Sequence, residues 1–262
     1  MTPRGGAVVA RWAHNPKVAG SSPAPATIEA GFKVGFFHIQ SIMEVIYEDN
    51  HIIIVNKRVG EIVQGDKTGD EPLSETLKIW LKEKYAKPGN VFCGVVHRID
   101  RPVSGVVVFA KTSKALSRLN SMIRNGEIKK TYYALVEGFP KLPEATLENM
   151  LISDGHLNKT FIARPGQPGA KKAVLKYHTL TKGDRYSLLE IRLLTGRKHQ
   201  IRCQLASMGH PIKGDLKYGS RRSNPDGGIS LHACKIEFIH PVSKIPISVE
   251  APLPVDMQKL LS

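Results

Sequence analysis

Cysteines, long apolar runs and acidic side chains are all scarce in this sequence of 262 residues. Its three cysteines, Cys93, Cys203 and Cys234, form no CxxC pair and no disulfide framework, which predicts a reducing, cytoplasmic compartment. No apolar run reaches the ~18 residues of a membrane-spanning helix, so we expect no membrane association. Apolar residues make up 41% and charged residues 23%, which is typical of a globular protein and excludes wholesale disorder.

Motifs of several common enzyme classes are also missing. The sequence holds no GxxxxGK[ST] phosphate loop, no GxGxxG before a helix and no HExxH. This argues against nucleotide hydrolysis and dinucleotide redox chemistry. The ten histidines show no spacing typical of metal ligands. We therefore expect neither a metal nor a cofactor.

The excess of positive charge is the first positive indication of function. Lysines and arginines number 38 against 23 acidic residues, for a net charge of +15. A basic surface of this size suits a polyanionic partner, and nucleic acid is the commonest one. From charge alone, a role in solubility stays an equal alternative.

The chain changes character near Met43. Residues 1–42 are rich in small residues and proline without a sustained period, and residues 13–27 resemble a transfer-RNA gene read as protein. We expect residues 1–42 to be a leader that is disordered or not native coding sequence, with Met43 as the natural start. Residues 43–262 are expected to form one folded domain.

From Met43 onward the patterns predict more strands than helices. Helices are expected over 72–85, 113–125 and 198–208, with Ser74 and Ser113 as N-caps. Strands are expected over 44–47, 51–55, 104–110, 129–137, 172–180, 186–194, 231–239 and 247–250. Many neighbouring strands are too closely connected for parallel crossovers. We therefore expect an α+β fold, with a mixed, largely antiparallel sheet flanked by helices.

The densest polar segment, residues 96–105, lies just ahead of a predicted buried strand. Asp100 is flanked there by Arg98 and Arg101, so its carboxylate is expected to stay ionised. Such a carboxylate can serve as nucleophile, base or metal ligand. The alternative is a turn aspartate in a surface ion pair.

Two further segments carry suitable chemistry. Arg197, His199 and Arg202 begin a predicted helix and offer donors for phosphates or a buried carboxylate, or else form a solvated basic face. Tyr132 and Tyr133 face opposite sides of a predicted strand. One of them can present its ring to an RNA base, although two tyrosines packed in a sheet are the alternative.

Together these segments resemble the RluA family of RNA pseudouridine synthases. Residues 97–105 are similar to its HR[LI]DxxTSG motif, with Val103 in place of threonine; residues 130–132 resemble its Lys-x-Tyr motif, and residues 195–202 its TGRxHQ[LI]R motif. The resemblance runs from about Met43 to the C-terminus. It implies the pseudouridine synthase fold, with 43–262 as the catalytic domain. It also implies a reaction in which a uridine of ribosomal or transfer RNA is detached at N1 and rejoined through C5, without cofactor or metal.

The resemblance also implies roles for single residues. Asp100 is the implied nucleophile, attacking either ribose C1′ or uracil C6, and Arg202 is implied to pair with it. Tyr132 is implied to stack on the target base, Ile201 to pack on the base's other side, and Arg98 to fill the gap that the flipped uridine leaves. The residues assigned to phosphates or local scaffolding are Arg101, Lys130, Arg197 and His199.

Two other functions stay open from the sequence. One is a non-catalytic RNA-binding or chaperone protein that uses the same basic surface. The other is a glycosidase or glycosylase, which needs a second placed acid, and Asp215 is the only motif-linked candidate. The sequence does not identify the RNA, although loops 154–170 and 219–229 are expected to select it. A monomer is the expected state.

Overall fold

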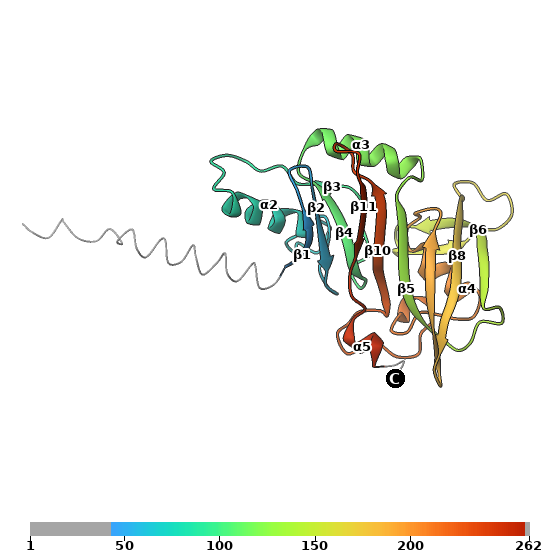
Figure 1. Ribbon diagram of the computed structural model, residues 1–262. Helices are drawn as coiled ribbons and strands as arrows, with labels where there is room; N and C mark the ends of the chain where they lie inside the picture. Colours follow the sequence, from blue (N-terminus) through green and yellow to red (C-terminus); the bar gives the residue numbers. More distant parts are fainter. Residues whose placement is uncertain (1–42, 260–262) are drawn as a thin grey trace, which may run out of the picture. The chain divides into compact units, whose positions relative to one another are not determined.

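A computed structural model describes residues 43–259 of the chain (Figure 1). The predicted leader, residues 1–42, lies outside the described residues, as do the last three residues. The division of the chain at Met43 therefore stays a prediction. No helix within 43–259 is long and apolar enough to cross a membrane.

A single mixed sheet of eleven strands organises the described residues. Its strands are β1 (Glu44–Glu48), β2 (Ile52–Lys57), β3 (Gly94–Val95), β4 (Ser104–Ala110), β5 (Lys129–Glu137), β6 (Glu144–Asp154), β7 (Lys159–Ile162), β8 (Lys171–Lys182), β9 (Tyr186–Leu193), β10 (Leu231–Ile239) and β11 (Pro246–Glu250). The spatial order is β1-β2-β4-β10-β5-β9-β8-β6-β7, with β3 paired to β4 and β11 to β10. Every pairing of these strands is antiparallel except that of β4 with β10, which confirms the α+β prediction.

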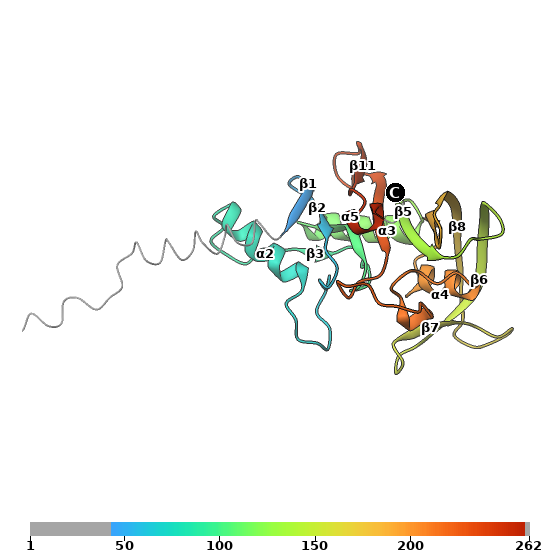
Figure 2. The ribbon, with the colours of Figure 1, turned by 90° about the horizontal axis from the view of Figure 1, so that it is seen from below.

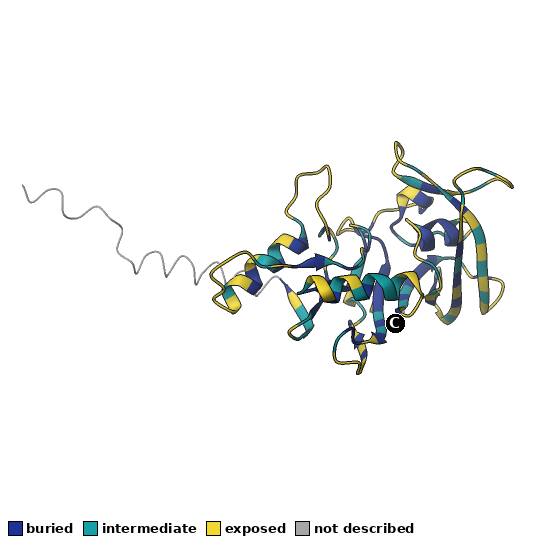
Figure 3. Ribbon diagram, turned by 90° about the horizontal axis from the view of Figure 1, so that it is seen from above, coloured by how far each residue is buried: buried dark blue, intermediate teal, exposed yellow. Residues whose placement is uncertain are grey.

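Four α-helices and one short 3-10 helix accompany the sheet in the described residues: α2 (Leu73–Lys84), α3 (Ser113–Arg124), α4 (Gln200–Ser207), α5 (Val255–Gln258) and η2 (Leu216–Tyr218). Helix α3 packs on β3 and β4 (Figure 1). Its Ala115 and Leu119 join an apolar core with side chains of β2, β4, β10 and β11. Helix α4 lies at the other half of the sheet beside β6 and β7 (Figure 2). Its first six residues are all buried (Figure 3).

The parallel contact of β4 with β10 explains one glycine of the first motif. Gly105 lies opposite Ala233 and has φ of +115°, a conformation that side-chain-bearing residues rarely adopt. A Cβ at Gly105 would collide with the backbone of Ala233. The close approach brings the loop before β4, which carries Asp100, next to the centre of the sheet.

Several local predictions need correction. Thr112, not Ser113, caps α3, because its side chain accepts from the Ala115 N–H. Ser74 lies buried inside α2, which begins after Pro72 without a side-chain cap. Helix α4 starts at Gln200 rather than at 198, because the chain before it forms a turn. Strands β6 and β7 were not predicted at all.

Candidate active site

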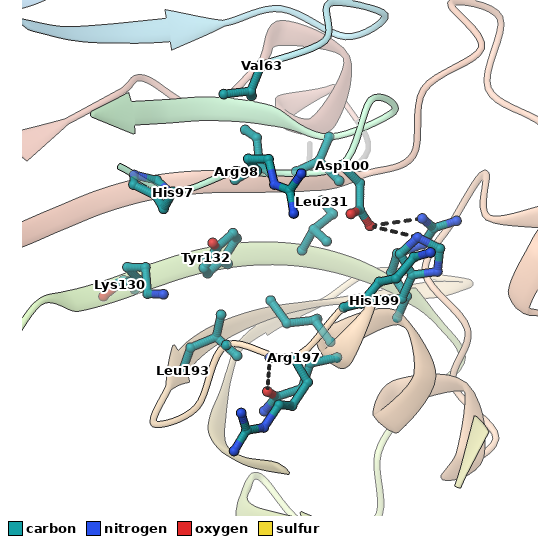
Figure 4. Close-up of a pocket in the computed structure, with 18 of the residues that line it drawn as sticks. Val63, His97, Arg98, Asp100, Lys130, Tyr132, Leu193, Arg197, His199 and Leu231 are labelled. Carbon is teal, nitrogen blue, oxygen red and sulfur yellow. Dashed lines mark hydrogen bonds and ion pairs between the residues drawn. The ribbon is translucent and has the colours of Figure 1, made fainter. Parts of the chain in front are cut away.

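All nine predicted site residues line one large cleft, about 1840 Å³ in volume. The cleft is bounded by the loop before β4, by β5, and by the segment from the end of β9 into α4. The three sequence motifs, which are up to about a hundred residues apart, thus meet in one place (Figure 4). The residues are Arg98, Asp100, Arg101, Lys130, Tyr132, Arg197, His199, Ile201 and Arg202.

The carboxylate of Asp100 is held from α4 and the turn before it. Its Oδ2 atom lies 3.0 Å from Nη1 of Arg202 and 3.6 Å from Nε2 of His199 (Figure 4). Its side chain keeps 30% of its surface exposed. A partly exposed carboxylate with a charge-assisted hydrogen bond is both fixed and accessible to a substrate.

Arg202 is itself anchored by a second carboxylate, that of Asp215. Its Nε and Nη2 atoms donate to the two Asp215 oxygens at 2.7 and 2.9 Å, a bidentate pair. Burial alone would lower the pKa of Arg202, but the hydrogen bonds and charges of Asp215 and Asp100 outweigh it and hold that pKa above its usual value. The guanidinium therefore stays charged and is fixed in one orientation.

Tyr132 faces the same part of the cleft from β5. Its side chain is buried, and Figure 4 shows Arg98, Asp100 and Tyr132 around one open space. Burial raises the pKa of the Tyr132 hydroxyl, and the negative charge of Asp100 adds to the effect. The hydroxyl is therefore protonated at neutral pH, and the group offers a ring and a hydrogen-bond donor.

The two arginines that flank Asp100 in the sequence contact other side chains. Nη2 of Arg101 lies 2.6 Å from the carboxylate of Asp70, and the pair is exposed. Arg98 is exposed, with Nη1 at 3.5 Å from Oε1 of Gln64. Both arginines line the cleft, while the partner of Asp100 comes from α4.

The remaining predicted residues differ in how tightly they are held. Nε of Arg197 donates to the carbonyl of Lys172 on β8 at 2.9 Å, which favours scaffolding over a free phosphate contact. Nζ of Lys130 lies close to Gly196, where an added Cβ would stand 3.4 Å away. Ile201 is buried in the wall of the cleft.

The side chain of Gln200 stabilises the turn that precedes α4. The Gln200 Oε1 atom accepts from the Thr195 hydroxyl at 2.8 Å and from the Arg197 N–H at 3.0 Å, while its Nε2 donates to the Val174 carbonyl at 3.1 Å. His199 then takes φ of +50°, in the left-handed region. This turn delays the start of the helix and directs His199 at the cleft.

His97, the first residue of the first motif, has a structural role. The Val108 N–H donates to Nε2 of His97 at 3.2 Å. Removal from water lowers the pKa of His97 to about 3, and the charge of Lys130 adds to this. The ring is therefore neutral at physiological pH and serves as an acceptor for β4.

A fully buried lysine supports the Asp100 loop and was not predicted. Nζ of Lys57 donates to the carbonyls of Arg58 at 2.8 Å and Arg101 at 3.1 Å. Burial lowers the pKa of Lys57 to about 8, although the charges of Glu61 and Asp100 oppose the shift. Lys57 thus ties the end of β2 to the loop that carries Asp100.

Sequence reasoning missed the supporting roles of Lys57 and Asp215. Asp215 lies 13 positions after Arg202, so its place shortly after the third motif was a usable signal. For Lys57 the only signal was its place at the end of the apolar run 52–55. Within residues 43–259, no group of three or more His, Cys, Asp or Glu side chains is arranged to hold a metal ion.

Comparisons with known proteins show which family the chain resembles. A profile of the RNA pseudouridylate synthase family matches residues 51–207, more than half of the chain. The chain is 34% identical over 228 residues to a ribosomal large subunit pseudouridine synthase D of Zymomonas mobilis, covering 83% of this chain and 71% of that protein. It is 33% identical over 243 residues to tRNA pseudouridine synthase C of Vibrio cholerae, covering 84% and 95%. The solved structure of human RNA pseudouridylate synthase domain containing 4 shares the fold, with a TM-score of 0.72, 20% identity and coverage of 89% and 96%.

Proposed function

The chain belongs to the RNA pseudouridylate synthase family, and we propose that its cleft isomerises uridine in RNA to pseudouridine, with Asp100 as the nucleophile. In this reaction the N1–C1′ bond breaks and a C5–C1′ bond forms. The C5 proton leaves and N1 takes up a proton, so the composition of the base is unchanged. The observation that carries the assignment is the Asp100 carboxylate, which is partly exposed in the cleft and held at 3.0 Å by Arg202.

A carboxylate suits this chemistry because it must attack and later leave. The pair with Arg202 orients Asp100 before the substrate arrives. Attack at ribose C1′ and attack at uracil C6 both fit this arrangement. We propose Arg202 as the residue that orients the nucleophile, and Asp215 as the residue that fixes Arg202.

We propose that the target base lies between Tyr132 and Ile201. The Tyr132 ring lines the cleft near Asp100 (Figure 4), and Ile201 offers an apolar surface on the α4 side. Arg98 is exposed on the loop beside them, which supports its proposed role in filling the gap that the flipped uridine leaves. We propose that Arg101 and Lys130 supply positive charge around this pocket and that Arg197 and His199 serve as scaffolding.

The glycosidase alternative loses its only motif-linked second acid. Asp215 is 1% exposed and both of its oxygens accept from Arg202. It cannot reach a glycosidic oxygen without breaking that pair. No specific observation favours the non-catalytic RNA-binding alternative over the enzyme.

The names of the relatives point to ribosomal or transfer RNA as the substrate, and we propose one of these two classes. The test incubates the full chain with C5-tritiated bulk ribosomal RNA and transfer RNA, each from a strain that lacks the gene. Release of tritium from one class identifies it, and primer-extension mapping then locates the uridine. Release from neither would remove both classes as substrates. A cytoplasmic location and a monomeric state stay predictions.

A further inference from the structure

A chain of polar contacts runs from β7 to the proposed nucleophile. The Thr160 N–H donates to Oη of Tyr218 at 2.8 Å, and this Oη lies 3.0 Å from Nδ1 of His199. The other ring nitrogen of His199, Nε2, lies 3.6 Å from Oδ2 of Asp100. His199 therefore stands between the Tyr218 hydroxyl and the carboxylate, with one nitrogen facing each.

The surroundings of His199 keep its ring neutral and fixed. Its side chain is 7% exposed, and its backbone is in the left-handed region at φ +50°, which is strained for a histidine. Burial lowers the pKa of His199 to about 4; Asp100 opposes this, and the cations Arg202, Lys198 and Lys217 reinforce it. At neutral pH the imidazole therefore has one N–H donor and one acceptor nitrogen.

The position of that single proton decides whether a lone pair or an N–H donor of His199 faces the Asp100 carboxylate. With the proton on Nδ1, the lone pair of Nε2 would face a carboxylate oxygen, which is repulsive. With the proton on Nε2, the ring donates toward Asp100, and Nδ1 accepts from Tyr218. The Tyr218 hydroxyl already accepts from the Thr160 N–H, so its own proton is free to be donated, and Nδ1 at 3.0 Å is nearer than the Thr160 carbonyl at 3.2 Å.

We propose that Tyr218 is a positioning residue that fixes His199 in the Nε2–H tautomer, so that His199 and Arg202 both donate to Oδ2 of Asp100. The distance of 3.6 Å is longer than a hydrogen bond, and catalytic hydrogen bonds commonly tighten only when substrate binds. Both donors fall on the same oxygen. The other oxygen, Oδ1, is then the one that attacks. This inference rests on the proposed role of Asp100.

The tautomer can be measured directly on the full chain without an activity assay. Long-range ¹H–¹⁵N spectra of ¹⁵N-histidine-labelled protein at pH 7 distinguish the two nitrogens of each ring, and His199→Gln identifies the signal of His199. We expect a neutral Nε2–H ring in the wild type and a loss of that preference in Tyr218→Phe, which keeps the aromatic ring. An Nδ1–H ring in the wild type, or an unchanged tautomer in Tyr218→Phe, would overturn the proposal.

Turnover then tests the consequence with a matched pair of neutral variants. The glutamine amide in His199→Gln reaches the position of Nε2, whereas the asparagine amide in His199→Asn reaches only that of Nδ1. We expect His199→Asn to lower kcat by about 10- to 100-fold with KM within about threefold, and His199→Gln to lower kcat by about fivefold or less. Equal reductions of kcat in the two variants would contradict the proposal.

A double-variant cycle separates a path through His199 from a general effect on packing. Tyr218→Phe should lower kcat by about fivefold or more alone, but by less than about twofold in the His199→Gln background. The same reduction in both backgrounds would show that Tyr218 acts by another route. If the wild type releases no tritium, the proposed function fails, while the tautomer measurement still decides the geometry.

Discussion

Arg202 donates a hydrogen bond of 3.0 Å to the carboxylate of Asp100, across 102 positions of the sequence. The remaining edge of the guanidinium is engaged by Asp215, and its carbon lies 5.0 Å from the centre of the Tyr218 ring. Arg202 thus has partners on its edges and on its face. Because its rotamer is fixed before substrate binds, little entropy needs to be lost on the way to the transition state.

Asp215→Asn should reduce both stability and turnover. The variant keeps the shape of Asp215 but leaves the buried Arg202 without its bidentate carboxylate, and breaking a buried pair costs about 3 kcal/mol or more. We expect a lower free energy of unfolding in urea. We also expect kcat to fall by about tenfold or more, because each ~1.4 kcal/mol of transition-state stabilisation is worth about tenfold in rate. Asp184→Asn, in an exposed turn, is the control. Unchanged stability and turnover in Asp215→Asn would contradict the anchoring role.

Lys57 should make the stability of the protein rise with pH in alkaline solution. Its pKa is about 8 in the folded chain against 10.5 ordinarily, so between these values the unfolded chain binds more protons and stability rises with pH. The gain is fully developed above pH 10.5 and disappears as pH falls through 8. Between about pH 7.5 and about pH 10 we expect wild-type stability to gain about 2 kcal/mol relative to Lys57→Met.

Urea unfolding of both proteins at the two pH values measures this difference. Parallel pH profiles would show that Lys57 does not titrate as its burial requires. Lys57→Met should also lower kcat. The carbonyls of Arg58 and Arg101 then lose their common donor, so the end of β2 is no longer tied to the loop that carries Asp100.

Substitutions at Tyr132 should separate stacking from hydrogen bonding. Tyr132→Leu removes the ring, and a base–aromatic stack contributes about 1–3 kcal/mol, so the Kd for substrate RNA should rise by about 5- to 150-fold. Tyr132→Phe keeps the ring that stacks on the base, so it should bind RNA with a Kd within about twofold of the wild type. Filter binding measures both. A wild-type Kd for Tyr132→Leu would exclude the stacking role.

Lysines on the rim of the cleft should contribute to the salt dependence of RNA binding. Lys129 and Lys198 are exposed and line the cleft. Replacing either with glutamine should weaken binding and reduce the slope of log K against log salt by about 0.7 to 0.9 for each phosphate that the variant no longer neutralises. Lys114→Gln, exposed on α3, is the charge-matched control. Equal salt-dependence slopes for all three variants would show that the RNA does not bind along this cleft.

The apolar strands and the motif residues were predictable because their patterns are local. Strand β6 was not recognised, although its residues alternate. The inward position Asn149 is polar and accepts from Nε2 of Gln204 at 2.8 Å, so the apolar side of the strand is interrupted in the sequence. A contact with a distant helix, and not local preference, makes this position fit the sheet.

The residues that line the cleft were predictable from the sequence, but the buried residues that hold them in place were not. The resemblance identified Asp100, Tyr132 and Arg202, which meet in the cleft. It did not indicate that Lys57 and Asp215 are buried charges, because a charged residue is normally expected at the surface. Burial becomes possible only when the chain brings two carbonyls to Lys57 and a guanidinium to Asp215, which are tertiary contacts.

The most direct measurement compares tritium release by the wild type and Asp100→Asn on the same C5-tritiated RNA, with the RNA Kd of both proteins measured in parallel. Asparagine keeps the shape of Asp100 and removes its charge. We expect release by the wild type and none by Asp100→Asn, with the two Kd values within about threefold, because phosphate contacts dominate the affinity. Release by Asp100→Asn at the wild-type rate would remove Asp100 from the mechanism and contradict the account.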